Sequence, residues 1–88
     1  MATYQILMWR EIPSQVKVWD DFEEVNLDLG PRFIARIDQA AQSEGLTGTD
    51  EYLSQWAWSE EQEREGIAGE VAQALVKELE ERFLWPKP

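Results

Sequence analysis

The chain begins with two stretches in which apolar and polar positions alternate, as they do along half-buried β-strands. Residues 4–12 alternate in this way, and residues 16–19 follow as a second β-rich stretch after a Pro-Ser break. Together they predict a β-hairpin. A loop over residues 13–15 would place Trp9 opposite Trp19, a favourable aromatic cross-strand pair. A two-residue loop would shift this register, and the sequence pattern does not decide between the two loop lengths.

A short third strand and a helix are expected next. Residues 25–29 alternate as a half-buried strand would, and Gly30 and Pro31 mark the start of a helix because proline suits the first helical turn. Apolar residues then recur at helical spacing up to Glu44. Gly45 fits the left-handed backbone position that ends a helix.

The second half of the chain predicts one more strand and a last helix. Thr49 fits the N-cap of a single helical turn. Residues 55–59 alternate and predict a fourth strand with both of its tryptophans facing inward, although the helix-forming residues 60–65 leave a helix as the rival assignment. An apolar stripe over residues 71–83 predicts the last helix, which Pro86 ends.

This order of elements, β-β-β-α-β-α, predicts an α+β fold. We expect a small antiparallel sheet of three to four strands, with two helices packed on one face. A chain of 88 residues suits a single domain over residues 1–88. Its core is expected at about residues 3–84, with residues 85–88 as a short C-terminal tail.

The composition removes most catalytic chemistry. The chain has no histidine and no cysteine, so it lacks the usual ligands of zinc and the usual base for a nucleophile. The acidic residues 20–24 lack the glycine and the ligand spacing of a calcium-binding EF-hand loop, and solvated turn carboxylates are the simpler interpretation. We therefore expect no metal, no cofactor and no enzymatic activity.

The charge balance bears on partners and location. Eighteen acidic residues against eight basic ones give a net charge of −10. Such a field repels phosphate backbones and anionic lipid, so we expect no direct binding of nucleic acid and no membrane association. The apolar residues 4–9 are too few for a signal peptide or a membrane span, and a cytoplasmic location is expected. A protein that mimics DNA through an acidic stripe along residues 60–81 remains an alternative.

Two tryptophans of the hairpin are the best candidates for a contact surface. If the even positions of the hairpin face the helices, Trp9 and Trp19 lie on the uncovered face of the sheet. Exposed tryptophans beside charged residues are typical of binding hot spots. With the opposite parity, both would belong to the core instead. The predicted protein-interaction surface comprises Trp9, Arg10, Ile12, Pro13, Gln15 and Trp19.

A second hypothesis places a small-molecule site between the sheet and the helices. Tyr52, Trp56 and Trp58 would line this pocket, which could hold a metabolite or serve a carboxylate-based enzyme. The two hypotheses differ in partner, since the hairpin surface suits another protein. A homodimer is also possible, because exposed strand edges pair readily.

Three segments of the chain, in their order and spacing, resemble the small bacterial "virulence factor" domain family. They are residues 4–16, then residues 45–53 followed by Trp56 and Trp58, and finally residues 64–80. Members of that family occur as free-standing small proteins, and similar segments end larger proteins that carry helical repeats. The resemblance therefore implies an accessory or interaction role, and it brings no catalytic residues with it.

Overall fold

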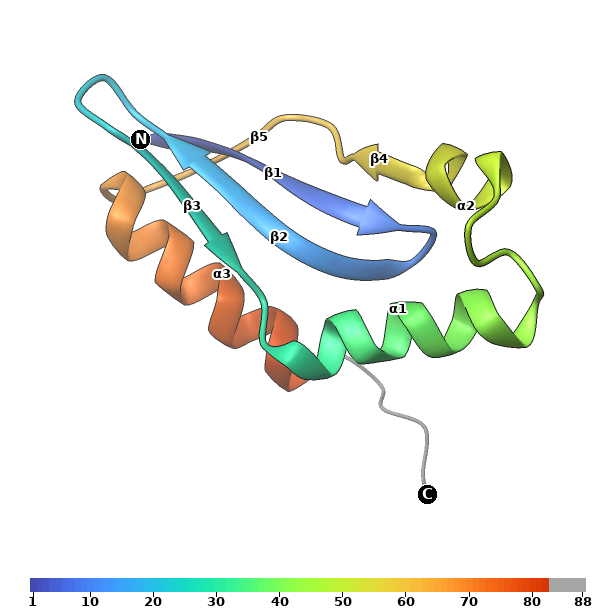
Figure 1. Ribbon diagram of the computed structural model, residues 1–88. Coiled ribbons are helices and arrows are strands. Elements are labelled where there is room, and N and C mark those ends of the chain that lie inside the picture. Colours follow the sequence, from blue (N-terminus) through green and yellow to red (C-terminus); the bar gives the residue numbers. More distant parts are fainter. Residues whose placement is uncertain (83–88) are drawn as a thin grey trace.

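An antiparallel sheet with helices packed on one face forms the structure, a computed structural model that describes residues 1–82 (Figure 1). The α+β fold predicted from the sequence is thereby confirmed. The elements in chain order are β1 (Ala2–Trp9), β2 (Ile12–Trp19), β3 (Glu24–Asp28), α1 (Pro31–Ser43), α2 (Asp50–Ser54), β4 (Trp56–Trp58), β5 (Gln62–Arg64) and α3 (Ala68–Arg82).

The strand order is β3-β2-β1-β4, and β5 also pairs with β1. β4 pairs with the end of β1 and β5 with its beginning, so the fourth position of the sheet holds an interrupted strand. Ser59 bridges the interruption, because its N–H donates to the Ile6 carbonyl at 2.8 Å and its hydroxyl accepts from the Ile6 N–H at 2.8 Å. The sequence pattern gave no sign of β5, where a helix was the rival assignment.

The β1–β2 hairpin turns at Arg10 and Glu11, so the predicted loop over residues 13–15 is wrong. Trp9 pairs with Ile12 and Trp19 pairs with Thr3, which also rules out the predicted Trp9–Trp19 pair. Arg10 adopts a φ of 55°, in the left-handed region. Two-residue hairpin turns usually mark such a position with glycine or asparagine, and its absence hid the turn.

A β-bulge at Ser14 changes which side of β1 faces the helices. Leu7 pairs with Gln15, but the next residue, Met8, pairs with Pro13, which leaves Ser14 without a partner in β1. The Ser14 carbonyl instead accepts a hydrogen bond from the Leu29 N–H at 2.9 Å. Strict alternation along β1 therefore stops at this bulge.

α3 packs on the half of the sheet formed by the beginning of β1, the end of β2 and β3. Val71 and Leu75 lie four residues apart on one face of α3, where they contact Val16 and Val18 of β2. Each of these side chains is buried, and full burial of an aliphatic side chain stabilises a fold by about 1.5–3 kcal/mol. The buried residues of this cluster are Ala2, Val16, Val18, Ala68, Val71, Ala72 and Leu75.

α1 covers the other half of the sheet, around the hairpin turn. Phe33, Ile37 and Ala41 recur at four-residue intervals and bury one face of the helix against Trp9 and Ile12. The two core clusters meet at Val76 and Leu79, which pack against both. The buried residues of the second cluster are Trp9, Ile12, Leu29, Phe33, Ile37, Ala41 and Leu46.

Several predicted helix ends are confirmed. α1 begins at Pro31, and Gly45 follows it with a φ of 68°. The Thr49 side chain caps α2 by accepting the Tyr52 N–H at 3.2 Å. The predicted helix end at Pro86 and the predicted tail lie outside the described residues.

Asp20 fastens the turn between β2 and β3 to the start of α3. One carboxylate oxygen accepts the Ala68 N–H at 2.8 Å, and the other accepts the N–H groups of Phe22 and Glu23 at 2.8 and 2.9 Å. These three hydrogen bonds favour the charged carboxylate, so they hold the pKa of Asp20 below its ordinary value. Across residues 1–82, no helix has the length and apolar content needed to cross a membrane.

Candidate functional site

One face of the sheet carries no helix, because α1 and α3 pack on the same side (Figure 1). The residues that alternate with the core positions of β2 point to this open face, among them Lys17 and Trp19. Gln5 pairs with Lys17 and Leu7 pairs with Trp58 on the neighbouring strands. An antiparallel sheet covered on one side only leaves the other side to water or to a partner.

Two tryptophans flank a lysine on this open face. The Lys17 ammonium nitrogen lies 5.6 Å from the ring centroid of Trp19 and 6.0 Å from that of Trp58. Both distances are in the range of cation–π attraction, which holds the three side chains together. Trp58 is 44% exposed, and Trp19 is partly exposed. We call Lys17, Trp19 and Trp58 the aromatic patch.

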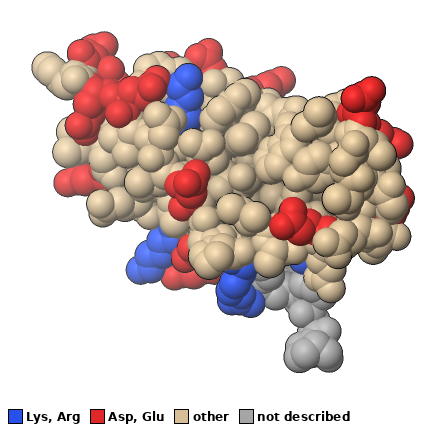
Figure 2. Space-filling view, in the orientation of Figure 1, with Lys and Arg blue, Asp and Glu red and all other residues tan. Residues whose placement is uncertain are grey.

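Carboxylates border the aromatic patch. Glu24 of β3 pairs with Trp19 across the sheet, and its carboxylate lies 3.7 Å from the Lys17 ammonium group. Glu63 of β5 lies opposite Thr3, the residue that pairs with Trp19 on its other side. In Figure 2, acidic side chains gather at the upper left, where Figure 1 places the turn between β2 and β3. Within the described part of the chain, no three carboxylates are placed to hold a metal ion.

Trp9, the first residue of the predicted contact surface, is instead part of the core. Its side chain is 0% exposed, and its indole N–H donates to the Tyr52 carbonyl at 3.0 Å. The bulge at Ser14 explains the error, because it lets Trp9 face the helices on the same side as Ile6. Ile12 and Pro13 are buried as well and offer no surface to a partner.

The other predicted contact residues lie in two different places. Gln15 and Trp19 are on the open face, where Gln15 pairs with Leu7. Arg10 lies at the hairpin turn and forms an ion pair with Glu44, just after α1. This hydrogen-bonded pair holds the pKa of Glu44 below its ordinary value and raises that of Arg10.

The three residues of the predicted small-molecule pocket do not form one site. Tyr52 and Trp56 meet edge to face with ring centroids 6.2 Å apart, and Tyr52 also contacts Trp9 at 5.7 Å. They pack against the core around α1. Trp58, two residues further along β4, is exposed and lies beside Lys17, so the prediction that both tryptophans face inward is wrong for Trp58. Trp56 pairs with the buried Trp9, whereas Trp58 pairs with Leu7, and the two tryptophans therefore have different surroundings.

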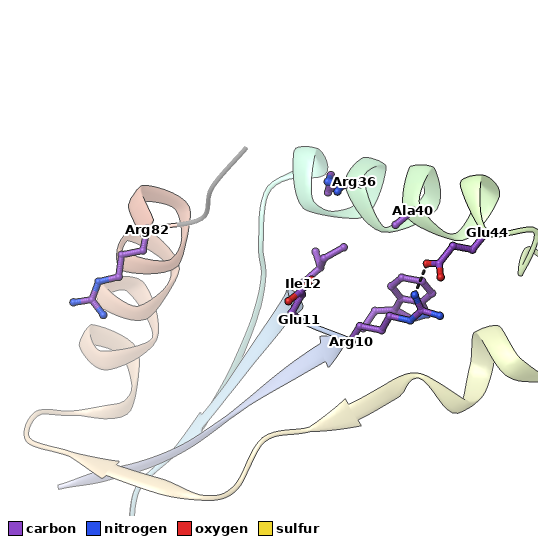
Figure 3. A pocket seen from close by; sticks show the side chains of 8 residues that line it. Arg10, Glu11, Ile12, Arg36, Ala40, Glu44 and Arg82 are labelled. Carbon is purple, nitrogen blue, oxygen red and sulfur yellow. Dashed lines mark hydrogen bonds and ion pairs between the residues drawn. The ribbon is translucent and has the colours of Figure 1, made fainter. Parts of the chain in front are cut away.

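A cavity of about 490 Å³ lies on the α1 side of the hairpin turn (Figure 3). Arg36, Ala40 and Glu44 occur at four-residue spacing along the same side of α1 and its C-terminal end, and all three line it. The figure shows Arg36 near Ile12, with the Arg10–Glu44 pair further along α1 and Arg82 on α3 at the other side. The described residues that line this cavity are Trp9, Arg10, Glu11, Ile12, Arg36, Ala40, Glu44 and Arg82.

The aromatic patch and the described residues that line the cavity all lie within the part of the chain that matches a known family. A family model described as "Virulence factor" matches residues 7–84. The chain belongs to the Virulence factor family. No curated protein and no solved structure matches it. Family membership confirms the resemblance drawn from the sequence, while the biochemical role has to be argued from the sites themselves.

Sequence reasoning misplaces one important residue of this Virulence factor domain and misses two. Regular alternation with Trp56 predicts that Trp58 faces inward, whereas its side chain is exposed beside Lys17. Lys17 is not among the predicted contact residues, although its two-residue spacing from Trp19 puts both on one face of a strand. Arg36 is also absent from the predicted sites, although its four-residue spacing from Ala40 puts both on one side of the predicted helix.

Proposed function

We propose that this Virulence factor domain is a non-catalytic interaction module that binds a basic protein through the open face of its sheet. The observation that carries the proposal is the aromatic patch, in which Trp19 and Trp58 flank Lys17 on a face without a helix. Half-exposed tryptophans held in place by a neighbour lose little conformational freedom on binding, which favours their use as anchors.

The charge of the domain supports a basic partner. A net charge of −10, with Glu24 and Glu63 beside the patch, attracts a positively charged surface and speeds the encounter with it. Two copies of this chain would each carry the same charge, which disfavours self-association through this face. A basic partner would be bound more weakly as the salt concentration rises.

The alternatives have less support. A carboxylate-based enzyme needs a carboxyl group whose pKa is raised by burial, whereas the shifts at Asp20, Glu44 and Glu78 all lower the pKa. A DNA mimic needs a stripe of unpaired acidic groups along α3. Glu78 of that helix is held by Arg64 in a two-pronged ion pair, which interrupts such a stripe.

The proposal is tested by removing both tryptophans of the aromatic patch. The double variant Trp19→Ala, Trp58→Ala and the wild type are used to capture partners from the native host, and each captured protein is then purified. Its affinity for both forms is measured by calorimetry at two salt concentrations. We expect the double variant to bind at least about thirtyfold more weakly, since a hot-spot tryptophan contributes about 2 kcal/mol or more.

A matched control keeps the number of lost apolar side chains equal. Ile34 of α1 and Leu53 of α2 are 49% and 65% exposed and lie away from the open face. The variant Ile34→Ala, Leu53→Ala should bind like the wild type. Equal binding by all three forms would contradict the proposal, and so would a partner whose affinity does not depend on salt.

A further inference from the structure

The cavity beside the hairpin turn carries positive charge on an acidic protein. Arg10, Arg36 and Arg82 line it, and they come from three different elements: the hairpin turn, α1 and α3. The chain contains eight basic residues in all, against 18 acidic ones. A concentration of three arginines at one cavity is therefore unlike the rest of this chain.

The arginines differ in how far they are already neutralised. Arg10 is bound to Glu44, and Arg82 lies 3.9 Å from Glu78 with a side chain that is 79% exposed. Arg36 is half-buried, and no hydrogen bond or ion pair joins its side chain to another residue among residues 1–82. A guanidinium partly withdrawn from water without a counter-ion favours the arrival of an anion. Among the described residues of the lining, the exposed Glu11 is an acidic residue that forms no ion pair with Arg10.

The walls between the charged groups are apolar. Trp9, Ile12 and Ala40 line the cavity between its arginines, and the small side chain of Ala40 leaves room beside the α1 helix. The volume of about 490 Å³ lies in the range of pockets that hold small molecules. A ligand that fits must combine an anionic group for Arg36 with an apolar body for these walls.

We propose that this cavity binds a small organic anion, a carboxylate or a phosphate monoester on an apolar body of about the size of one ring. The anionic group pairs with the guanidinium of Arg36. The apolar body lies against Ile12 and Ala40. This site is separate from the aromatic patch on the open face and does not depend on the partner proposed for that face.

The test uses NMR, because Trp9, one of the residues around the cavity, carries an indole N–H that reports on its surroundings. Its indole N–H is recorded in ¹⁵N-labelled protein during titration with four probes: benzoate, acetate, phenyl phosphate and inorganic phosphate. We expect benzoate or phenyl phosphate to shift this signal in a saturable way at millimolar concentrations. Acetate and inorganic phosphate should shift it at least about tenfold less at the same concentration, since they lack the apolar body.

Three variants separate the cavity from general electrostatics. Arg36→Gln removes the guanidinium that contacts the anionic group of the ligand. Ala40→Leu fills the cavity without a change of charge. Lys77→Gln removes an exposed positive charge of α3 that does not line the cavity. The first two variants should weaken binding at least about tenfold, and Lys77→Gln should bind like the wild type, with circular dichroism confirming the fold of each.

Other outcomes overturn the proposal. A signal that shifts with none of the four probes would show that the cavity does not accept this class of ligand. An equal loss of probe affinity in Arg36→Gln and Lys77→Gln would show that the probes are attracted unspecifically to positive charge. Full binding by a folded Ala40→Leu variant would place the ligand elsewhere. Each of these results would leave the test of the open face unaffected.

Discussion

Replacing Trp9 with alanine should destabilise the domain far more than the same change at Trp58. Trp9 is 0% exposed and packs against Tyr52 and the α1 residues of its core cluster, while Trp58 is 44% exposed. Loss of a buried tryptophan costs about 3–5 kcal/mol, because it removes the apolar contacts and leaves a cavity. The Tyr52 carbonyl also loses the indole N–H that reaches it at 3.0 Å.

The size of this loss can be set against the stability of the whole domain. At about 0.05–0.15 kcal/mol per residue, an 88-residue domain has a free energy of unfolding of about 4–13 kcal/mol. Trp9→Ala therefore removes about a quarter of it or more, and Trp9→Phe, which keeps a ring, should lose less. Trp58→Ala should cost less than about 1.5 kcal/mol, since its ring keeps much of its contact with water.

Urea denaturation followed by far-ultraviolet circular dichroism measures these differences without relying on the tryptophan signal. With a slope of about 1 kcal/mol per molar urea, the Trp9→Ala midpoint should fall by about 3 M or more, or the variant should be unfolded without urea. The Trp58→Ala midpoint should fall by less than about 1.5 M. If the two variants lost equal stability, or Trp58→Ala lost more, the assignment of Trp9 to the core and Trp58 to the surface would be refuted.

Three further predictions concern the links that hold the elements together. The folded-state pKa of Asp20 is depressed, so its stabilising effect is present above the ordinary value of 3.8 and is lost as the pH falls through the folded pKa. Asp20→Ala should therefore lower the thermal midpoint at pH 7, and its effect should shrink as the pH falls below 3.8. Gly66→Ala should lower the free energy of unfolding by about 1–3 kcal/mol, because Gly66 has a φ of 123° and an added Cβ would lie 3.1 Å from the Val71 side chain; an unchanged urea midpoint would contradict this. Arg64 holds the pKa of Glu78 down, so the stability that this pair contributes is lost as the pH falls. In Glu78→Gln, the free energy of unfolding should therefore depend less steeply on pH in the acidic range.

The parts of the fold that follow from local signals could be predicted from the sequence. Pro31 and Gly45 bound α1, and Thr49 starts α2, because each acts through its own backbone or side chain. The hairpin turn could not be read in this way, since Arg10 adopts a left-handed conformation without the glycine that usually announces it. Its position is fixed instead by pairing along the whole of β1 and β2.

The prediction of the candidate site from the sequence depends on a regular alternation, which the bulge breaks. A single unpaired residue, Ser14, lets Trp9 face the helices, while the regular part of β2 leaves Trp19 on the open face. Trp58 then takes the place on that face that had been expected for Trp9. The idea of an uncovered face with two tryptophans follows from the sequence, but the identity of the second tryptophan depends on a long-range irregularity.

The interrupted strand beside β1 has a consequence for how the protein behaves at high concentration. A long, straight strand at a sheet edge invites strands from other molecules to add to it, which leads to aggregates and fibrils. β4 and β5 are three residues long each, with the irregular residues 59–61 between them, so they offer an incoming strand no continuous row of free backbone groups. At the opposite edge, β3 begins with Glu24 and ends with Asp28, and these charges discourage the addition of a strand from another molecule. The sheet can therefore leave the face with Trp19 and Trp58 uncovered while its edges protect the domain from polymerising.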